Sequence, residues 1–308
     1  SPCSKVEMPQ KKSNLLLWII VGGGAFCFVV LCLLAAVAYF TGGGSSGLSL
    51  SSGQIAVIDV EGVISDSREF VEDRKDFGNR WTVKSVVLRI SSPGGGVAAS
   101  QEMYEAMKKF REETKKKVVV SMGSVAASGG YYIACAADRI FANPGTITGS
   151  IGVIAEWYNY GDLLQWAKMQ NIVIKSGTFK DAGSSTRPLT EEEKVYFQSL
   201  IGNMYNQFVS AVASGRNMED AAVRKLADGR VYTGQEAKAD GLVDELGTMQ
   251  DAIDAAAKMA GIKGEPKILR PVRKSFTILD LLLGDARSAL SLSPDRSDSH
   301  IRFQYLWR

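Results

Sequence analysis

The most constraining feature of this sequence is an apolar run without charged residues over positions 15–40. As a helix the run would be about 39 Å long at 1.5 Å per residue. That length exceeds the roughly 30 Å hydrocarbon core of a bilayer, so a tilted helix could cross it. A cleaved signal peptide is the alternative, but its apolar part is normally shorter, and no obvious cleavage context ends this run. The run therefore predicts a transmembrane helix.

The charges that flank this run predict its orientation. Lys5, Lys11 and Lys12 precede it, whereas residues 41–53 carry no charge. Because positive charge is retained on the cytoplasmic side, residues 1–14 are expected in the cytoplasm and residues 41–308 outside it. The Gly- and Ser-rich composition of residues 41–53 is typical of a flexible linker. The chain is thus expected to be a single-pass protein of the cell membrane with an extracytoplasmic domain.

Beyond the linker, short apolar runs alternate with stretches of helical period. Residues 97–113, for example, place Met103, Met107 and Phe110 on one helical face. Such alternation is typical of α/β folds. Strands are expected near residues 55–64, 86–90, 118–121, 139–142, 151–154 and 172–175. Helices are expected near residues 97–113, 127–137, 161–169, from a capping box at Thr190 and Glu193 onward, and near 218–227 and 248–260.

The charge balance and the rare residue types exclude several kinds of function. With 36 basic and 33 acidic residues, the composition gives no reason to expect a nucleic-acid partner. The basic run Lys115–Lys117 is interpreted as a solvated turn. His300 is the single histidine and lies in a polar tail, which argues against a histidine base and excludes a multi-histidine metal site. Cys135 is expected to be a small core residue.

Two glycine-rich segments could carry chemistry, and each has a structural alternative. In SMGSVAASGGYYIACAAD, a strand leads to a helix that starts near Ser128, whose hydroxyl would lie beside unpaired N–H groups. That serine could equally be a helix N-cap. In RISSPGGGVAAS, the backbone N–H groups after Pro93 could bind an oxyanion. A tight strand-to-helix turn explains the same residues.

A third segment, IVIKSGTFKDAGS, contains two lysines that could act as a base. Lys175 and Lys180 are both candidates, provided that one of them is neutral when it accepts a proton. Lys180 follows Phe179 in a Gly-, Ser- and Thr-rich stretch that could turn inward. The alternative for either lysine is an ordinary solvated surface charge.

Together these segments resemble signal peptide peptidase A, also called protease IV. The motifs that carry the resemblance are AASGGYY, SSPGGG, TGSIGVI, GTFKDAGS and RVYTGQEAKADGLVDELG. They cover roughly residues 54–262, which would form a Ser-Lys protease domain, and leave residues 263–308 as a C-terminal extension, whose last thirty-odd residues are expected to be peripheral. The resemblance implies an α/β fold built as a spiral of ββα units, as in the crotonases and the Clp protease subunit.

The resemblance also implies a role for five residues. Ser128 matches the nucleophile, and Lys180 matches the general base. Ser150 matches a hydroxyl that orients the lysine, and the N–H groups of Gly95 and Gly129 match the oxyanion hole. No cofactor is implied, and the substrates would be remnant signal peptides and other apolar segments at the membrane.

A single copy of each motif bears on assembly. In the long form of the family, the lysine comes from one tandem repeat and the serine from the other. The resemblance therefore implies a homo-oligomeric ring, plausibly octameric, in which Ser128 of one chain meets Lys180 of its neighbour. Two other functions stay open: a catalytically silent membrane scaffold or adaptor, and a crotonase-type acyl-CoA enzyme, which an extracytoplasmic location disfavours.

Overall fold

The computed structural model describes residue 33, residues 53–271 and residues 302–307. The chain divides into two units, residues 1–50 and 51–308. The predicted cytoplasmic segment and transmembrane run lie outside the described residues, apart from the single helical residue Leu33. Among the described residues, no helix combines the length and the apolar character needed to cross a bilayer.

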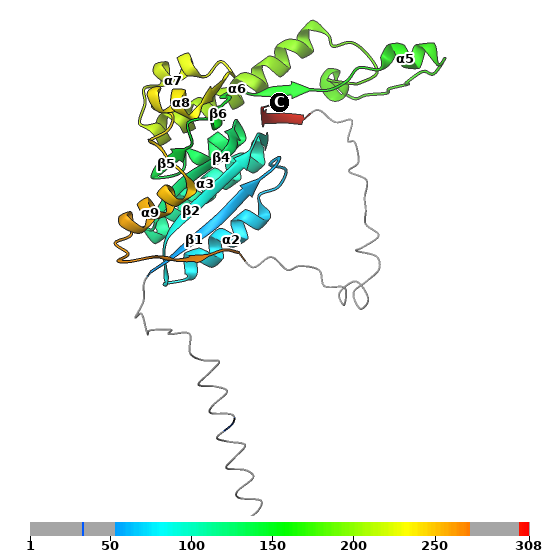
Figure 1. The fold of residues 1–308 in the computed structure, drawn as a ribbon. Helices are drawn as coiled ribbons and strands as arrows, with labels where there is room; N and C mark the ends of the chain where they lie inside the picture. The colour runs from blue at the N-terminus through cyan, green and yellow to red at the C-terminus, as the bar shows by residue number, and fades with distance from the viewer. Residues whose placement is uncertain (1–32, 34–52, 272–301, 308) are drawn as a thin grey trace, which may run out of the picture. The chain divides into compact units, whose positions relative to one another are not determined.

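A mostly parallel sheet forms the centre of the second unit (Figure 1). Its strands lie in the order β10–β1–β2–β4–β5–β9, and each neighbouring pair is parallel. β6 pairs in parallel with the C-terminal end of β4, and β8 pairs in antiparallel with β6. The strands are β1 (Gln54–Glu61), β2 (Val83–Ser92), β4 (Lys117–Ala127), β5 (Arg139–Ala142), β6 (Ile147–Gly149), β8 (Val231–Thr233), β9 (Glu245–Leu246) and β10 (Lys267–Leu269). This arrangement confirms the predicted α/β class.

A smaller antiparallel sheet joins three segments that are far apart in the sequence. Its order is β3 (Gly94–Gly96), β11 (Arg302–Leu306) and β7 (Ile154–Glu156). β11 is the middle strand and pairs with both neighbours. The C-terminal strand therefore lies directly against the glycine-rich segment.

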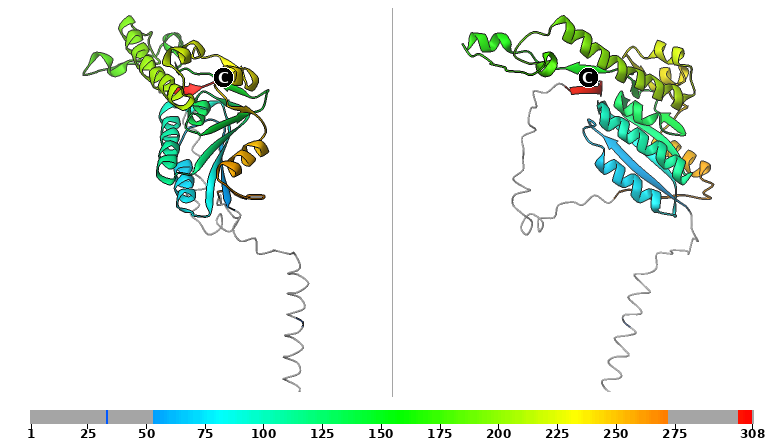
Figure 2. Two further views of the ribbon diagram at one scale, coloured as in Figure 1. Left: turned by 90° about the vertical axis from the view of Figure 1, so that its left-hand side faces the viewer. Right: turned by 180° about the vertical axis from the view of Figure 1, so that it is seen from behind.

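Helices cover both faces of the parallel sheet, as Figure 2 shows. On the central strands, alternate residues point to opposite faces: Ile58, Leu88 and Val120 belong to one apolar cluster, and the residues that precede each of them belong to the other. α2 and α3 cover the first face, and α9 covers the second. The helical elements are α2 (Arg68–Asn79), α3 (Val97–Thr114), α4 (Gly129–Ala134), α5 (Gly161–Trp166), the 3-10 helix η1 (Thr178–Asp181), α6 (Glu191–Arg216), α7 (Asp220–Leu226), α8 (Gly234–Ala239) and α9 (Met249–Met259).

The predicted capping box at the start of α6 is confirmed. The Thr190 hydroxyl accepts a hydrogen bond from the Glu193 N–H, and the Glu193 carboxylate accepts one from the Thr190 N–H. This reciprocal pair satisfies two N–H groups that have no partner within the helix. It therefore defines where α6 begins.

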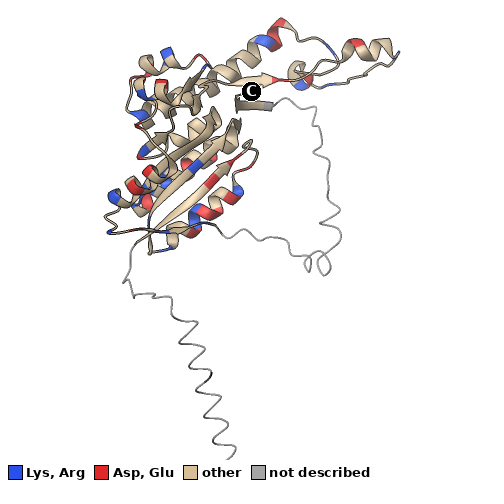
Figure 3. Ribbon diagram, in the orientation of Figure 1, with Lys and Arg blue, Asp and Glu red and all other residues tan. Residues whose placement is uncertain are grey.

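α2 was not expected from the sequence, because few of its residues are apolar. Only Phe70 and Phe77 of this helix are buried, and charged residues of both signs are spread along its ribbon (Figure 3). The Lys116 Nζ donates hydrogen bonds to the carbonyl oxygens of Phe77, Gly78 and Arg80 at the end of this helix. The middle lysine of the basic run is thus not simply solvated but caps a neighbouring helix.

Two expectations are wrong. Residues 172–175 form no strand, and Ile174 there is 97% exposed. Their apolar pattern suits a strand, but none of the described strands pairs with them. The expectation that the whole C-terminal extension is peripheral fails for residues 302–307, because Tyr305 is fully buried.

The tight packing between α3 and the sheet leads to a prediction of stability. Phe110 is 1% exposed, so the Phe110→Ala substitution should reduce the free energy of unfolding by about 3–5 kcal/mol. Trp81, which is 75% exposed, is the matched control, and Trp81→Ala should change stability by less than about 0.5 kcal/mol. Urea unfolding followed by circular dichroism measures both. Equal losses for the two variants would contradict this assignment of the core.

Candidate active site

Ser128 lies at the turn that joins β4 to α4. Its N–H donates to the Gly149 carbonyl oxygen at 2.8 Å, and its carbonyl accepts from the Tyr132 N–H at 2.8 Å. The residue is 1% exposed, yet its side chain makes no capping hydrogen bond to α4. The backbone is thus held on both sides while the hydroxyl is left available, which disfavours the interpretation of Ser128 as a simple N-cap.

The backbone of Ser128 is strained. Its φ of 53° and ψ of −116° lie in a region that L-residues rarely adopt. Among the described residues, the other non-glycine residues with positive φ are Lys115, Ser150, Lys168 and Asn217. Lys115 and Asn217 end helices, and Lys168 follows Ala167, the C-cap residue of another helix. Of these residues, only Ser128 and Ser150 do not lie at the C-terminal end of a helix, which would explain a positive φ. Backbone strain of this kind is typical of functional sites.

The glycine segment approaches the start of α4 so closely that side chains are excluded. A Cβ atom on Gly129 would lie 3.2 Å from the Gly95 nitrogen. A Cβ atom on Gly94, whose φ is +100°, would lie 2.7 Å from the Gly129 nitrogen. The two N–H groups predicted to bind an oxyanion are therefore neighbours, next to Ser128. The segment is also a tight strand-to-helix turn, so the two interpretations describe the same residues.

Ser150 lies beside this cluster. It directly follows Gly149, whose carbonyl holds the Ser128 N–H, and its own N–H donates to the Arg230 carbonyl at 2.8 Å. Ser150 borders a cavity of about 520 Å³ that Leu306 and Trp307 also line. The fold thus brings Ser128, Ser150 and both glycines together from distant parts of the sequence.

Lys180 is exposed, whereas Ser128 is buried, and no hydrogen bond joins these two residues in the described part of the chain. Lys180 belongs to η1, in the arm formed by residues 157–190 between β7 and α6. The arm, which includes α5, extends away from the parallel sheet (Figures 1 and 2). Within the part of the chain that the structure describes, the Lys180 ammonium has no hydrogen-bond or ion-pair partner.

Lys175, the other candidate base, is committed to an ion pair. Its Nζ lies 2.5 Å from Asp181 Oδ1 and also donates to the Thr178 carbonyl. Arg187 binds the same carboxylate and makes a second ion pair with Glu193. Hydrogen bonds from Arg187 and then Lys175 lower the pKa of Asp181. These contacts tie the segment that carries Lys180 to the start of α6.

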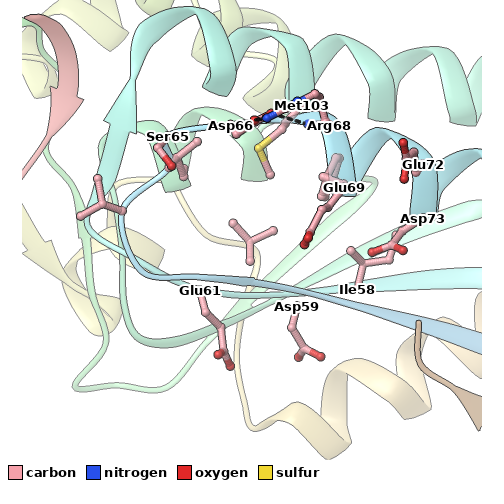
Figure 4. A pocket seen from close by; sticks show the side chains of 14 residues that line it. Ile58, Asp59, Glu61, Ser65, Asp66, Arg68, Glu69, Glu72, Asp73 and Met103 are labelled. Carbon is pink, nitrogen blue, oxygen red and sulfur yellow. Dashed lines mark hydrogen bonds and ion pairs between the residues drawn. The ribbon is translucent and has the colours of Figure 1, made fainter. Parts of the chain in front are cut away.

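The remaining candidates do not form an alternative centre. Burial raises the pKa of the Cys135 thiol to about 12, which confirms that it is a core residue and not a nucleophile. A hollow of about 530 Å³ between β1 and α2 is lined by carboxylates that include Asp59, Glu61 and Glu69 (Figure 4). Across residues 53–271 and 302–307, no group of three or more His, Cys, Asp or Glu is arranged to bind a metal ion. His300 lies outside the described residues.

The sequence analysis did not identify Tyr305 as part of the site. In β11 this residue pairs with Gly95, and a Cβ atom on Gly94 would lie 2.0 Å from its carbonyl oxygen. The available signal was the alternation of large aromatic residues at Phe303, Tyr305 and Trp307, which is typical of a short strand. That signal does not reveal the strand's partner.

Comparisons with known proteins identify the family to which the chain belongs. The model of peptidase family S49 matches residues 110–263. A putative protease of Synechocystis sp. is 47% identical over 68% of this chain and 75% of its own length. The putative signal peptide peptidase SppA of Enterococcus faecium is 38% identical over 68% of this chain and 64% of its own length. Protease 4 of Salmonella typhi is 36% identical over 74% of this chain but only 39% of its own length.

The ion pairs around Arg187 predict how firmly the lysine segment is held. Replacing Arg187 with Met should speed proteolytic nicking between residues 175 and 190 by roughly tenfold, because Asp181 and Glu193 each lose one hydrogen-bond partner. Arg224, which forms an exposed pair with Asp220, is the control, and Arg224→Met should leave the rate unchanged. Limited proteolysis with mass spectrometry measures both rates.

The same network predicts an acid dependence. Arg187 lowers the pKa of Glu193 as well as that of Asp181. Such groups stabilise the fold above their unfolded pKa, and that contribution is lost as pH falls through the lowered folded value. Protection of the wild-type segment should therefore weaken progressively below about pH 4. If protection is the same at pH 3 and pH 7, the network does not hold the segment.

Proposed function

Because the chain belongs to peptidase family S49 and is a serine peptidase, we propose that it cleaves peptide bonds with Ser128 as nucleophile and Lys180 as general base. The observation that carries this proposal is the strained, buried Ser128 beside the neighbouring N–H groups of Gly95 and Gly129. This is the geometry that acyl transfer needs: a free hydroxyl next to donors for the developing oxyanion.

The proposed reaction follows from the positions of these groups. Neutral Lys180 removes the proton from the Ser128 Oγ, which attacks the scissile carbonyl carbon. The N–H groups of Gly95 and Gly129 stabilise the tetrahedral oxyanion, each contributing about 3–4 kcal/mol in comparable enzymes. Protonated Lys180 then gives a proton to the leaving amine, and water releases the acyl group by the reverse sequence. Ser150 would orient the lysine.

The exposure of the Lys180 side chain, which makes no hydrogen bond to the buried Ser128 in the described part of the chain, supports a site shared between chains. We propose that Lys180 of one chain enters the site of its neighbour in a closed homo-oligomeric ring, plausibly of eight chains. The arm that carries Lys180 exposes large apolar side chains that include Trp166, Ile172 and Ile174. Contiguous exposed apolar surface is typical of protein interfaces. The strand-like run 172–175 would find its partner there.

The proposed substrates are remnant signal peptides and other apolar peptide segments. One relative is named a putative signal peptide peptidase, and an anchor over residues 15–40, with the domain 54–262 outside the cytoplasm, would place the site at the membrane.

The ββα spiral of the crotonases and the Clp protease subunit remains the proposed detailed topology. The available Ser128 hydroxyl disfavours the two alternative functions. It has no role in a silent scaffold, and acyl-CoA chemistry of the crotonase type does not need it.

The first test is loss of activity at the proposed nucleophile and base. Ser128→Ala and Lys180→Ala should each reduce kcat/KM for an apolar peptide by at least about 10⁴-fold. Lys175→Ala should retain most of the activity, because Lys175 is ion-paired to Asp181. Since only a neutral lysine accepts a proton, kcat/KM of the wild type should rise with pH along a single limb.

A serine-reactive acylating probe distinguishes the peptidase from the scaffold. The probe should label Ser128 stoichiometrically in the wild type and not in Ser128→Ala, as peptide mapping by mass spectrometry would show. Labelling at another serine, or none at all with a folded protein, would refute the assignment.

A second test concerns the shared site. Ser128→Ala and Lys180→Ala chains, inactive alone, should regain activity when co-assembled, because some neighbours then pair an intact serine with an intact lysine. In randomly mixed rings at equal amounts, about one quarter of the sites would be intact. Mixing Ser128→Ala with the double variant is the control, since no intact site can form. Inactivity in rings shown to be mixed would mean that the site is not shared.

A further inference from the structure

The chain enters the parallel sheet at the end that lies opposite the proposed active site. β1, β2, β4 and β5 are mutually parallel, so their first residues share one end of the sheet and their last residues share the other (Figure 1). Ser128 and the glycine segment follow the last residues of β4 and β2. The residues that precede β1 belong to the Gly- and Ser-rich segment 41–53. That segment therefore joins the sheet at the end away from Ser128.

An exposed tryptophan and a lysine lie beside this point of entry. The Gln54 N–H, at the start of β1, donates to the Thr82 carbonyl at 2.9 Å, and a Cβ atom on Gly53 would lie 2.6 Å from the Lys84 Cγ. Trp81 is 75% exposed, and the Lys84 Nζ lies 5.7 Å from the centroid of its ring. The fold thus holds a large aromatic ring and a cation at the entry point without burying the ring.

A basic hollow adjoins these residues where α3 ends and β4 begins. Its volume is about 430 Å³, and its lining comprises five basic and two acidic residues: Lys108, Arg111, Lys115, Lys116, Lys117, Glu112 and Asp138. Burial lowers the pKa of the Lys116 ammonium, and the nearby charge of Lys84 lowers it further. Lys84 therefore adds to the positive charge of the hollow.

Only part of this positive charge is neutralised within the fold. Arg111 and Lys117 both bind the Asp138 carboxylate, at 2.8 Å and 3.1 Å. Lys84 and Lys115 are exposed, and neither forms an ion pair within the part of the chain that the structure describes. The carboxyl end of α3 favours a cation at Lys115, but that effect accounts neither for Lys84 nor for the exposed indole beside it.

We propose that Trp81, Lys84, Lys115 and Lys117 form a docking surface for a bilayer that contains anionic lipids. The indole lies at the level of the headgroups, a position that tryptophan favours because its ring is apolar and its N–H is polar. The ammonium groups bind the lipid phosphates, as clusters of basic residues near a membrane anchor do. The docking surface presupposes the proposed anchor over residues 15–40 and is independent of the proposed peptidase chemistry.

The length of the segment 41–53 suits this surface. A Gly- and Ser-rich chain of that length has a root-mean-square end-to-end distance on the order of 20 Å. Attraction between exposed charges decays over about 8–10 Å at physiological salt, so a domain tethered this closely meets the lipid surface continually. Tethering gives a high effective concentration, and contacts that are weak individually are then sufficient.

Docking at this end would set the height of the active site above the bilayer. β4 has 11 residues and begins at Lys117, and Ser128 follows its last residue. At about 3.3 Å per residue, the strand would hold Ser128 up to about 36 Å from the lipid headgroups. The site would then act on peptide segments that have left the plane of the bilayer.

Residue-resolved footprinting of the full chain tests the docking surface. The chain is reconstituted into nanodiscs of phosphatidylcholine, either alone or mixed with phosphatidylglycerol, and lysine acetylation and hydroxyl-radical oxidation are mapped by mass spectrometry. In the anionic nanodiscs, Lys84, Lys115 and Trp81 should react at least about fivefold more slowly than in the neutral ones. High salt should remove the protection of the lysines, because it screens the attraction.

Exposed residues elsewhere in the chain are the internal controls. Lys225 lies in α7, Lys238 lies in α8, and Trp166 is 82% exposed, and each should react at the same rate in both kinds of nanodisc. Equal rates for the docking residues would overturn the proposal. Protection by dissolved inorganic phosphate in neutral nanodiscs would also overturn it, because the hollow would then bind a free anion. A chain that does not enter nanodiscs would refute the anchor and the docking surface together and leave the peptidase proposal intact.

Two charge-matched variants test the role of the lysines. One replaces three lysines of the docking surface with glutamine, and the other replaces three exposed lysines outside it: Lys84, Lys115 and Lys117 in the first, and Lys194, Lys225 and Lys238 in the second. The first variant should lose the protection of Trp81 by anionic lipid, whereas the second should retain it. Protection that persists in the first variant, or that is lost in both, would overturn the proposal.

Discussion

The close approach of backbone to backbone at Gly94, Gly95 and Gly129 is the contact on which the rest of the site depends. Three segments converge there: the end of β2 with the glycine turn, the start of α4, and β11. A single Cβ atom at Gly94 or Gly95 would fall within 2.1 Å of a carbonyl oxygen of another segment. Glycine is required because any side chain would separate the N–H groups from the nucleophile.

The rigid sheet explains how strain at Ser128 is maintained. β4 is a central strand that pairs with β2, β5 and β6, and its residues are covered on both faces. The strand therefore places Ser128 at a fixed point, and its hydrogen bonds to the Gly149 carbonyl and from the Tyr132 N–H restrict the turn further. An unfavourable φ persists only where the surrounding packing determines it more strongly than local preference does. The same packing places Tyr132 beneath the C-terminal strand.

The arm contrasts with this rigid centre. Most of its large apolar side chains are exposed, and an ion-pair network of Lys175, Asp181, Arg187 and Glu193 holds part of it against the start of α6. That network attaches the segment around η1 to the capping box of α6. Lys180 takes no part in the network. A site assembled from such an arm would be completed only when a second chain covers the apolar surface, which would couple activity to assembly.

The sequence by itself determined the α/β class, the strands β2, β4 and β5, the helix α3 and the capping box of α6, because apolar periodicity and cap chemistry act locally. Its motifs also singled out Ser128, Ser150, Gly95 and Gly129, which the fold then brings together. Only the tertiary structure decided that Lys180 is exposed while Ser128 is buried, that residues 172–175 form no strand, and that Tyr305 pairs with Gly95. Those outcomes depend on contacts between segments up to about two hundred residues apart. Local pattern cannot specify such contacts, since a strand's sequence shows that it can pair but not with which edge.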